Sequence, residues 1–225
     1  MSLLTLYHGS KKIISTPDMT LSGTCRDFGE GFYVTQTKEA AAQWACCPAS
    51  SGFVNKYELE TENLNILDLY SEKYTILNWA ALVMSARKYR ISEASFERNL
   101  EYLTENFYVD PSEADIVKGP RADETYFFFA RSFLRGKISV RQLKTLMNLG
   151  PMGEQIAVRS GEAFRRLLFC SFEGVDAVYA YSKKKTRNDG ALANYYAEID
   201  LGDEGGLYIG DILKKGIKND DERLR

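Results

Sequence analysis

Residues 27–35, Asp-Phe-Gly-Glu-Gly-Phe-Tyr-Val-Thr, are the part of the chain that most restricts how it can fold. Two glycines one residue apart permit a sharp turn, and the apolar, aromatic run 32–34 that follows is typical of a short strand. Thr37 is then placed to cap a helix that begins at Lys38. The segment therefore predicts a turn, a strand and a helix in direct succession, with the ring of Tyr33 as a flat surface on which an aromatic heterocycle can stack.

Apolar periodicity divides the rest of the chain into short strands and amphipathic helices. We expect strands at residues 3–7, 53–59, 64–69, 114–117, 155–158, 177–181 and 195–199. We expect helices at 76–84, at 96–107 with a cap near Ser92, after the capping-box pair Ser139 and Gln142, and after Ser160 as far as Leu168, whereas 126–134 is either helical or core-buried. The basic run 183–187, in the loop expected at 183–190, can either contact phosphates or nucleic acid or be solvated. We favour a solvated loop, because no aromatic residues are interleaved with its charges.

These elements fit one α+β domain over residues 1–225, with a core at 4–170, a helical insertion at 72–107 and a C-terminal elaboration at 171–225. The formal net charge of −2 excludes the broad basic field that a whole-surface binder of nucleic acid or anionic membrane needs. No apolar run approaches the ~20 residues of a membrane span, and the N-terminus lacks a signal-peptide layout. Four cysteines without a CxxC pair and one histidine make a metal site unexpected, so we expect reduced thiols in a cytoplasmic protein.

The only histidine, His8, stands near the expected end of the first strand, in Tyr7-His8-Gly9-Ser10. A neutral imidazole there can hydrogen-bond a ribose hydroxyl. The small residues after it let backbone N–H and C=O groups approach a ligand closely. A carboxamide such as nicotinamide needs that pairing, one acceptor and one donor from a single glycine.

The run His8-Gly9-Ser10, followed by the segment at 27–35 and a helix, resembles the ADP-ribosyltransferase superfamily, in the branch shared with poly-ADP-ribose polymerases. The nearest resemblance is to the bacterial proteins grouped as DUF3990, over about residues 4–170. It implies an ADP-ribosyltransferase-like split β-sandwich of two small, mostly antiparallel sheets, with flanking helices and a helical insertion. NAD⁺ is expected in the cleft between the sheets.

The resemblance also implies roles for individual residues. His8 and Ser10 are expected at the ribose, Gly9 is expected to clamp the nicotinamide amide, and Tyr33 is expected to stack on nicotinamide. The remaining expected NAD⁺-binding residues belong to the second motif and are Phe28, Gly29 and Thr35.

The third motif departs from the family's pattern. By its order in the chain, Gln155 occupies the place of the glutamate that stabilises the oxocarbenium-like transition state, with Glu154 one residue earlier. Neighbouring residues of a strand face opposite ways, so only one of the two enters the site, and we favour Gln155. An amide can orient a ribose hydroxyl, but it lacks the carboxylate, a loss of roughly a few kcal/mol of electrostatic stabilisation. We expect catalytic roles for His8 and for Gln155, or Glu154 in its place, and no polymer synthesis.

Three functions stay open. The favoured one is an NAD⁺-dependent mono-ADP-ribosyltransferase that cleaves the nicotinamide N-glycosidic bond, with Asp123 directed toward an unknown protein or nucleic-acid acceptor. The second is a non-catalytic module that binds NAD⁺ or ADP-ribose, favoured by the missing glutamate. The third is an RNA 2′-phosphotransferase on a related fold, which needs arginines around a phosphate; Arg26, Arg121 and Arg159 are available.

Overall fold

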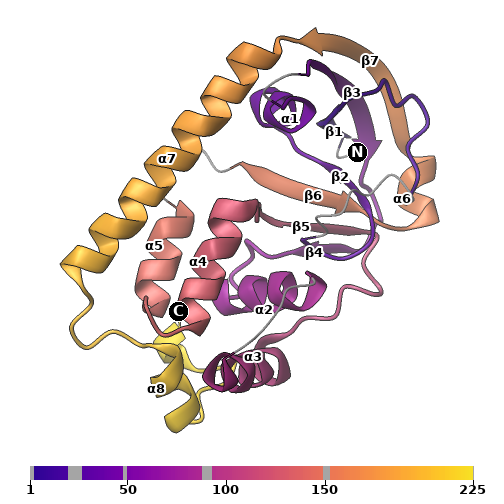
Figure 1. Cartoon of the computed structure of the whole chain (residues 1–225). Coiled ribbons are helices and arrows are strands. Elements are labelled where there is room, and N and C mark those ends of the chain that lie inside the picture. Colours follow the sequence, from indigo (N-terminus) through magenta and orange to yellow (C-terminus); the bar gives the residue numbers. More distant parts are fainter. Residues whose placement is uncertain (1–2, 20–26, 48–49, 88–92, 149–152, 225) are drawn as a thin grey trace.

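Two open sheets form the β part of the protein (Figure 1). The computed structural model describes residues 3–19, 27–47, 50–87, 93–148 and 153–224. Sheet A has the order β1-β3-β7 and is antiparallel throughout; its strands are β1 (Leu3–Ser10), β3 (Gly52–Glu60) and β7 (Leu167–Val175). Sheet B has the order β2-β6-β5-β4 and contains one parallel pair, β4 with β5; its strands are β2 (Phe32–Val34), β6 (Glu154–Val158), β5 (Ile116–Pro120) and β4 (Ile66–Asp68).

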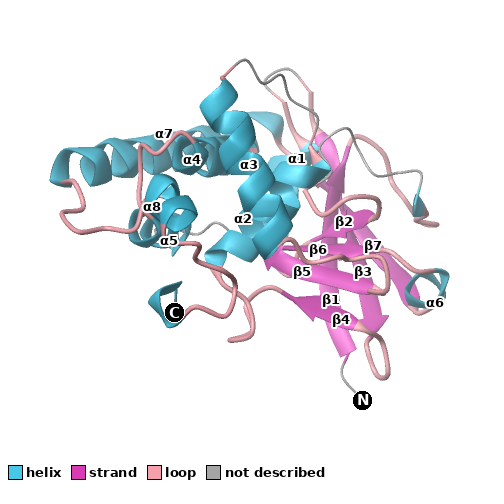
Figure 2. Cartoon of the chain, turned by 90° about the horizontal axis from the view of Figure 1, so that it is seen from below, coloured by secondary structure: helices cyan, strands magenta, loops and turns pink. Residues whose placement is uncertain are grey.

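Most of the helices gather on one side of the strands (Figure 2). In chain order they are α1 (Lys38–Ala45), α2 (Ile76–Ala86), α3 (Ala94–Phe107), α4 (Glu124–Leu134), α5 (Val140–Asn148), α6 (Gly161–Arg165), α7 (Ala177–Leu201) and α8 (Ile209–Lys214). A short 3-10 helix, Glu222–Leu224, lies near the C-terminus. The predicted mixed α+β class with two mostly antiparallel sheets is therefore confirmed. Within the described ranges, no helix combines the length and the apolarity needed to cross a membrane.

Successive side chains along the strands of sheet B point to opposite faces of the sheet, and the two faces belong to two separate hydrophobic cores. Phe32 and Val34 point toward sheet A and pack with Leu6 and Tyr57 in a cluster between the two sheets. Tyr33 points the other way and belongs to the larger cluster that the helices bury. Because each fully buried apolar side chain contributes roughly 1.5–3 kcal/mol, both faces of sheet B are strongly specified, and the direction of the Tyr33 ring with them.

The C-terminal part differs most from the sequence-based expectation. Strands were predicted at 177–181 and 195–199 with a basic loop between them, and this was wrong, because one helix, α7, covers the whole stretch. Its N-cap is Asp176, whose carboxylate accepts from the Tyr179 N–H at 2.8 Å. Tyr195 is buried and its ring stacks on Phe129, with centroids 5.6 Å apart. Tertiary packing thus overrides the breaker sequence Asn188-Asp189-Gly190.

Smaller differences concern the ends of elements. β1 continues through His8, Gly9 and Ser10. The helix after Ser160 ends at Arg165, and Leu167 and Leu168 instead begin β7, a strand that was not predicted. The predicted cap at Ser92 lies outside the described residues. The predicted capping box is confirmed, since Ser139 and Gln142 exchange hydrogen bonds of 3.0 and 3.1 Å.

Gly9 is required by close packing of α1 on sheet A. A Cβ added at Gly9 would lie 1.7 Å from the backbone oxygen of Ala41 and 2.8 Å from the Ala45 nitrogen. Any side chain here would force α1 away from β1. The glycine that the resemblance assigns to a ligand therefore also has a structural reason to be a glycine.

Gly190 offers the opposite case and a test of α7. It lies within the helix, and a Cβ there meets no atom within 4 Å. We expect Gly190→Ala to raise the free energy of unfolding by about 0.5–1 kcal/mol, because alanine loses less backbone entropy in a helix. Urea denaturation measures the change, with Gly9→Ala as the control that should destabilise. A destabilising Gly190→Ala would contradict a continuous α7.

Candidate functional site

The pairing of β1 with β2 stops after a single step. Tyr7 and Thr35 exchange reciprocal backbone hydrogen bonds of 2.7 and 2.9 Å. In an antiparallel pair, the next hydrogen-bonded partners would be Gly9 and Tyr33, two residues further along. Instead, the Tyr33 carbonyl accepts a hydrogen bond from Nδ1 of His8 at 2.7 Å. The imidazole therefore takes the place of a backbone donor, and the two strands separate at this point.

The separation leaves the peptide groups of Gly9 at an open edge. Alternate residues of a strand direct their N–H and C=O groups to the same side, so those of Gly9 point, like those of Tyr7, away from β3. In the part of the chain that the structure describes, neither group of Gly9 has a hydrogen-bond partner. One donor and one acceptor on the same residue are thus left on the side of β1 that faces β2.

His8 is held in one tautomer. Because a carbonyl oxygen only accepts, Nδ1 carries the proton and Nε2 is an acceptor. Burial lowers the pKa of His8 from its ordinary value of 6.5, and this effect outweighs the hydrogen bond to the Tyr33 carbonyl, which raises it. The ring also contacts Phe32, with centroids 4.4 Å apart. The result is a neutral imidazole on the Phe32 face of β2, opposite to the face of the Tyr33 ring.

The Tyr33 hydroxyl fixes the turn before β2. It accepts from the Phe28 N–H at 3.0 Å and donates to the Gly29 carbonyl at 2.5 Å. Gly29 has a φ of +83°, a conformation that favours glycine. Phe28 is fully buried, and its carbonyl accepts from Arg159 at 2.5 Å. Phe28 and Gly29 therefore position Tyr33, and Arg159 is bound to this turn.

A cavity of about 360 Å³ lies beside the Tyr33 ring. Its walls come from β2, β6, α1, α7, the end of α2 and the junction of β5 with α4. The lining residues are Asp27, Tyr33, Trp44, Arg87, Arg121, Asp123, Glu124, Gln155, Lys184 and Asn188. Of the residues predicted from the sequence, the structure brings Tyr33, Gln155 and Asp123 together here. His8, Gly9, Ser10, Phe28, Gly29, Thr35 and Glu154 do not line this cavity.

Gln155 and Glu154 point to opposite sides of β6, as expected for neighbours on a strand. Gln155 is 5% exposed and lines the cavity, whereas Glu154 forms an ion pair of 2.8 Å with Lys118. Gln155 is close enough to Asp27 to oppose the rise that burial causes in the pKa of this carboxyl. Its amide can donate to Asp27 from the NH₂ group and accept from a ligand through Oε1.

Asp27 is the buried anion beneath this arrangement. Arg87 donates to it from Nε at 2.8 Å, and the Ala122 N–H donates at 3.3 Å. Burial raises the pKa of Asp27, while the charge of Arg87 opposes the rise. The side chains of Arg87 and Asp27 are only 8% and 5% exposed, so the pair is an internal tie between the turn before β2 and the end of α2.

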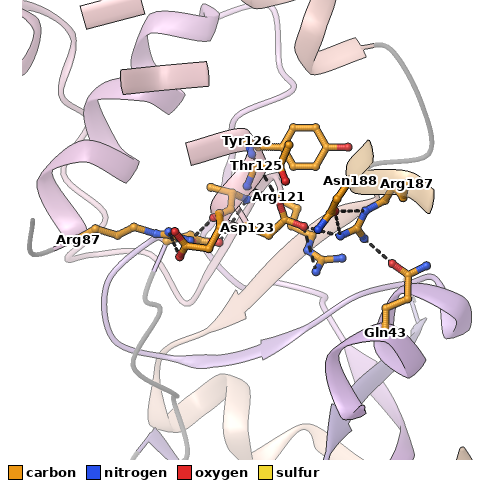
Figure 3. A network of polar contacts seen from close by, with 11 residues as sticks. Gln43, Arg87, Arg121, Asp123, Thr125, Tyr126, Arg187 and Asn188 are labelled. Carbon is orange, nitrogen blue, oxygen red and sulfur yellow. Dashed lines mark hydrogen bonds and ion pairs between the residues drawn. The ribbon is translucent and has the colours of Figure 1, made fainter. Parts of the chain in front are cut away.

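The carboxylate of Asp123 is turned inward, onto two arginines (Figure 3). It caps α4 by accepting from the Thr125 N–H at 3.2 Å. It also lies 2.5 Å from Nη2 of Arg187 and 3.4 Å from Nη2 of Arg121. Arg187 donates in addition to Gln43 of α1 at 2.5 Å. Asp123 thus links α1, α4 and α7 while it also lines the cavity.

Ser10 and Thr35 are bound within the protein. Ser10 Oγ accepts from the buried Asn55 at 3.2 Å, and the same Asn55 accepts from the Ile14 N–H at 2.9 Å. Thr35 is fully buried and its Oγ1 accepts from the Thr37 N–H at 3.2 Å. Asn55 thus fixes the chain that follows β1, a role that its strand pattern alone did not reveal. Arg26 lies outside the described residues.

A family model described as "Protein of unknown function (DUF3990)" matches residues 4–169. The chain belongs to the DUF3990 family. No curated protein and no solved structure matches the chain. The DUF3990 match ends early in β7, so α7 lies beyond it, together with the cavity residues Lys184 and Asn188.

Several cavity residues of this DUF3990 chain were not predicted as site residues. Arg87 carries no local signal, because it reaches Asp27 across 60 positions of sequence. Lys184 and Arg187 did carry a local sequence signal. Together with Ala180, Ala191 and Tyr195, they recur at helical spacing. Because we interpreted residues 183–190 as a loop, we did not predict that these residues share one face of a helix.

The neutral state of His8 can be observed directly, because the chain has one histidine. We expect proton NMR of the imidazole to give a pKa below 6.5 in the folded protein. The unfolded chain then binds a proton more readily, so stability should fall as pH drops from about 6.5 toward the folded-state value. His8→Phe should remove this part of the pH dependence. A folded-state pKa above 6.5 would refute the proposed environment.

The Asp27–Arg87 pair should matter far more to stability than a surface pair. Arg87→Met leaves Asp27 buried without its counterion, and we expect a cost of about 3–5 kcal/mol. The matched control is Lys38→Met, which breaks the exposed ion pair with Glu173 and should cost about 0–1 kcal/mol. Urea unfolding of both variants measures the difference. Equal losses would contradict the internal role of Arg87.

Proposed function

We propose that this DUF3990 chain binds NAD⁺ at the opening between β1 and β2 and acts as an NAD⁺-dependent mono-ADP-ribosyltransferase. The observation that carries the proposal is the peptide edge of Gly9, whose donor and acceptor lie on the β2 side of β1 without a partner in the described ranges. A nicotinamide carboxamide has the complementary pair, an oxygen that accepts and a nitrogen that donates. The resemblance of the surrounding motifs to ADP-ribosyltransferases supports the same placement.

The neighbouring side chains fit this ligand. The neutral His8 offers Nε2 as an acceptor for a ribose hydroxyl. The Tyr33 ring is held at the gap by its own hydroxyl, which suits it to stacking. Because α1 packs directly on Gly9, the ligand must reach its peptide groups along the strand edge and not from the face of the sheet.

Gln155 is the residue assigned to the reacting ribose. NAD⁺ supplies an activated N-glycosidic bond, whose cleavage releases nicotinamide with the bonding electron pair and joins ADP-ribose to an acceptor that loses a proton. The Oε1 atom of Gln155 can accept from a ribose hydroxyl and turn the negative end of its dipole toward developing positive charge. A full carboxylate at this position would face the buried Asp27, and like charges at such close range disfavour each other. A neutral amide at position 155 therefore avoids repulsion with Asp27, but it stabilises the transition state less than a carboxylate would.

A non-catalytic NAD⁺-binding module is the second candidate, and the amide at position 155 favours it. An RNA 2′-phosphotransferase has less support, because Arg159 is bound to the Phe28 carbonyl. Of the three arginines considered for this function, Arg121 lines the cavity.

Calorimetric titration with NAD⁺ tests the binding half of the proposal. His8→Ala and Tyr33→Ala should each weaken NAD⁺ binding roughly five- to tenfold, since each removes one hydrogen bond or one stacking contact. Tyr33→Phe is the matched control that keeps the ring. Unchanged affinity in both alanine variants, with the fold intact by circular dichroism, would refute the site.

Release of nicotinamide tests the chemical half. We expect Gln155→Leu to lower the release rate at least about tenfold, the effect of one lost transition-state hydrogen bond. The double variant Asp27→Asn, Gln155→Glu keeps one amide and one carboxylate, which can hydrogen-bond, and moves the carboxylate to position 155. We expect this variant to release nicotinamide faster than the wild type. NAD⁺ binding without release, in the wild type and in this double variant, would identify a module instead of an enzyme.

A further inference from the structure

Arg121 is a buried cation with spare hydrogen-bonding capacity. Its side chain is 5% exposed and lines the cavity. Among the described residues, its Nη1 has no hydrogen-bond partner, although the atom is buried. A buried donor without an acceptor costs roughly 1–3 kcal/mol, more when the group is charged. Such an atom at a cavity wall indicates that an acceptor from outside the chain belongs there.

The guanidinium of Arg121 is held in a fixed plane. It lies over the Trp44 ring, 5.2 Å from the centroid. Its Nη2 lies 3.4 Å from Asp123, a carboxylate that is closer to Arg187, at 2.5 Å. Arg121 is therefore oriented by its contact with the Trp44 ring and by its ion pair with Asp123. This arrangement leaves the Nη1 side of the guanidinium for a ligand.

Lys184 brings a second cation to the same cavity. It is half-buried on α7, and no ion pair of its ammonium group occurs in the described ranges. Burial and the nearby charge of Arg121 lower its pKa. Burial likewise lowers the pKa of Arg121 to about 10, with Arg187 as a further cause. Arg121, Arg187 and Lys184 all lie around Asp123, and the charge of Asp27 also acts on Arg121. The mutual repulsion of the three cations favours a bound anion.

We propose that Arg121 and Lys184, with Trp44 as the supporting wall, form a phosphate-binding subsite. A phosphate presents three or more oxygens to these two cations, whereas a carboxylate presents two. The arginine fork suits two phosphate oxygens, and lysine contributes a point charge to a third. Since Lys184 lies beyond residue 169, the subsite depends on a helix outside the DUF3990 match.

The phosphate has two possible sources, the pyrophosphate of NAD⁺ or a separate phosphate-bearing substrate, and both present the same oxygens. The cavity also contains Tyr33 and Gln155, so either source places its phosphate close to the proposed reaction centre. The subsite itself rests on the geometry of Arg121 and Lys184, and it stands whether or not NAD⁺ binds.

Calorimetry of the full chain with inorganic phosphate, at constant ionic strength and with acetate as the control anion, tests the proposal. Wild type should bind phosphate more tightly than acetate. Lys184→Met should weaken phosphate binding about three- to tenfold, and Arg121→Gln at least about tenfold, because charge-assisted hydrogen bonds are the strong ones. The matched control is Lys183→Met, which removes the same charge from an exposed neighbour on α7 and should leave binding unchanged.

Equal binding of phosphate and acetate, or equal effects of Lys184→Met and Lys183→Met, would overturn the subsite. If Arg121→Gln does not fold, the comparison of the two lysine variants decides. A further titration with NAD⁺ at saturating phosphate identifies the source. Competition assigns the subsite to the pyrophosphate of NAD⁺, and independent binding assigns it to a separate substrate. Phosphate binding without any NAD⁺ binding sustains the subsite and refutes the proposed function.

Discussion

The contact between α1 and the bare backbone of Gly9 is the constraint on which the candidate site depends. It fixes α1 directly above β1, with the Ala41 carbonyl in the space of a missing side chain. Since α1 follows β2 after three residues, the position of α1 also limits how far β2 can run beside β1. Beyond Thr35 this connection ends the pairing, and in the other direction the His8 imidazole satisfies the Tyr33 carbonyl. The packing of α1 and the unpaired peptide groups thus meet at one glycine.

Ion pairs and hydrogen bonds of two arginines connect the helices and the turn around the cavity. Arg187 joins α7 to α1 through Gln43 and to the beginning of α4 through Asp123. Arg87 and Asp27 join the end of α2 to the turn before β2. These ties connect segments that are far apart in sequence, and each uses a buried or half-buried ion pair. They bring the charged walls of the cavity around Gln155 and Arg121.

Local sequence predicted the elements that carry a strong periodic or turn signal. The turn, strand and helix around Tyr33 and the Ser139–Gln142 capping box were all recognisable, although the Thr37 side chain makes no capping hydrogen bond at the start of α1. The placement of Gln155 toward the cavity followed from strand alternation. In contrast, α7 contains an Asn-Asp-Gly sequence that favours a turn, and only the burial of Ala191 and Tyr195 against other helices makes it continuous. Arg87 and Asn55 owe their roles to partners that are distant in sequence, which no local pattern can indicate.

The cavity has a floor and a wall of different origin. Tyr33 and Gln155, in the floor, belong to the strands of sheet B inside the DUF3990 match, and their neighbours fill both cores. Lys184 and Asn188, in the wall, belong to α7, whose central turns expose most of their residues to solvent. Substitutions on this part of α7 can therefore change the charge and shape of the cavity while the packing of sheet B stays the same. Such a substitution is therefore expected to alter the cavity at little cost in stability.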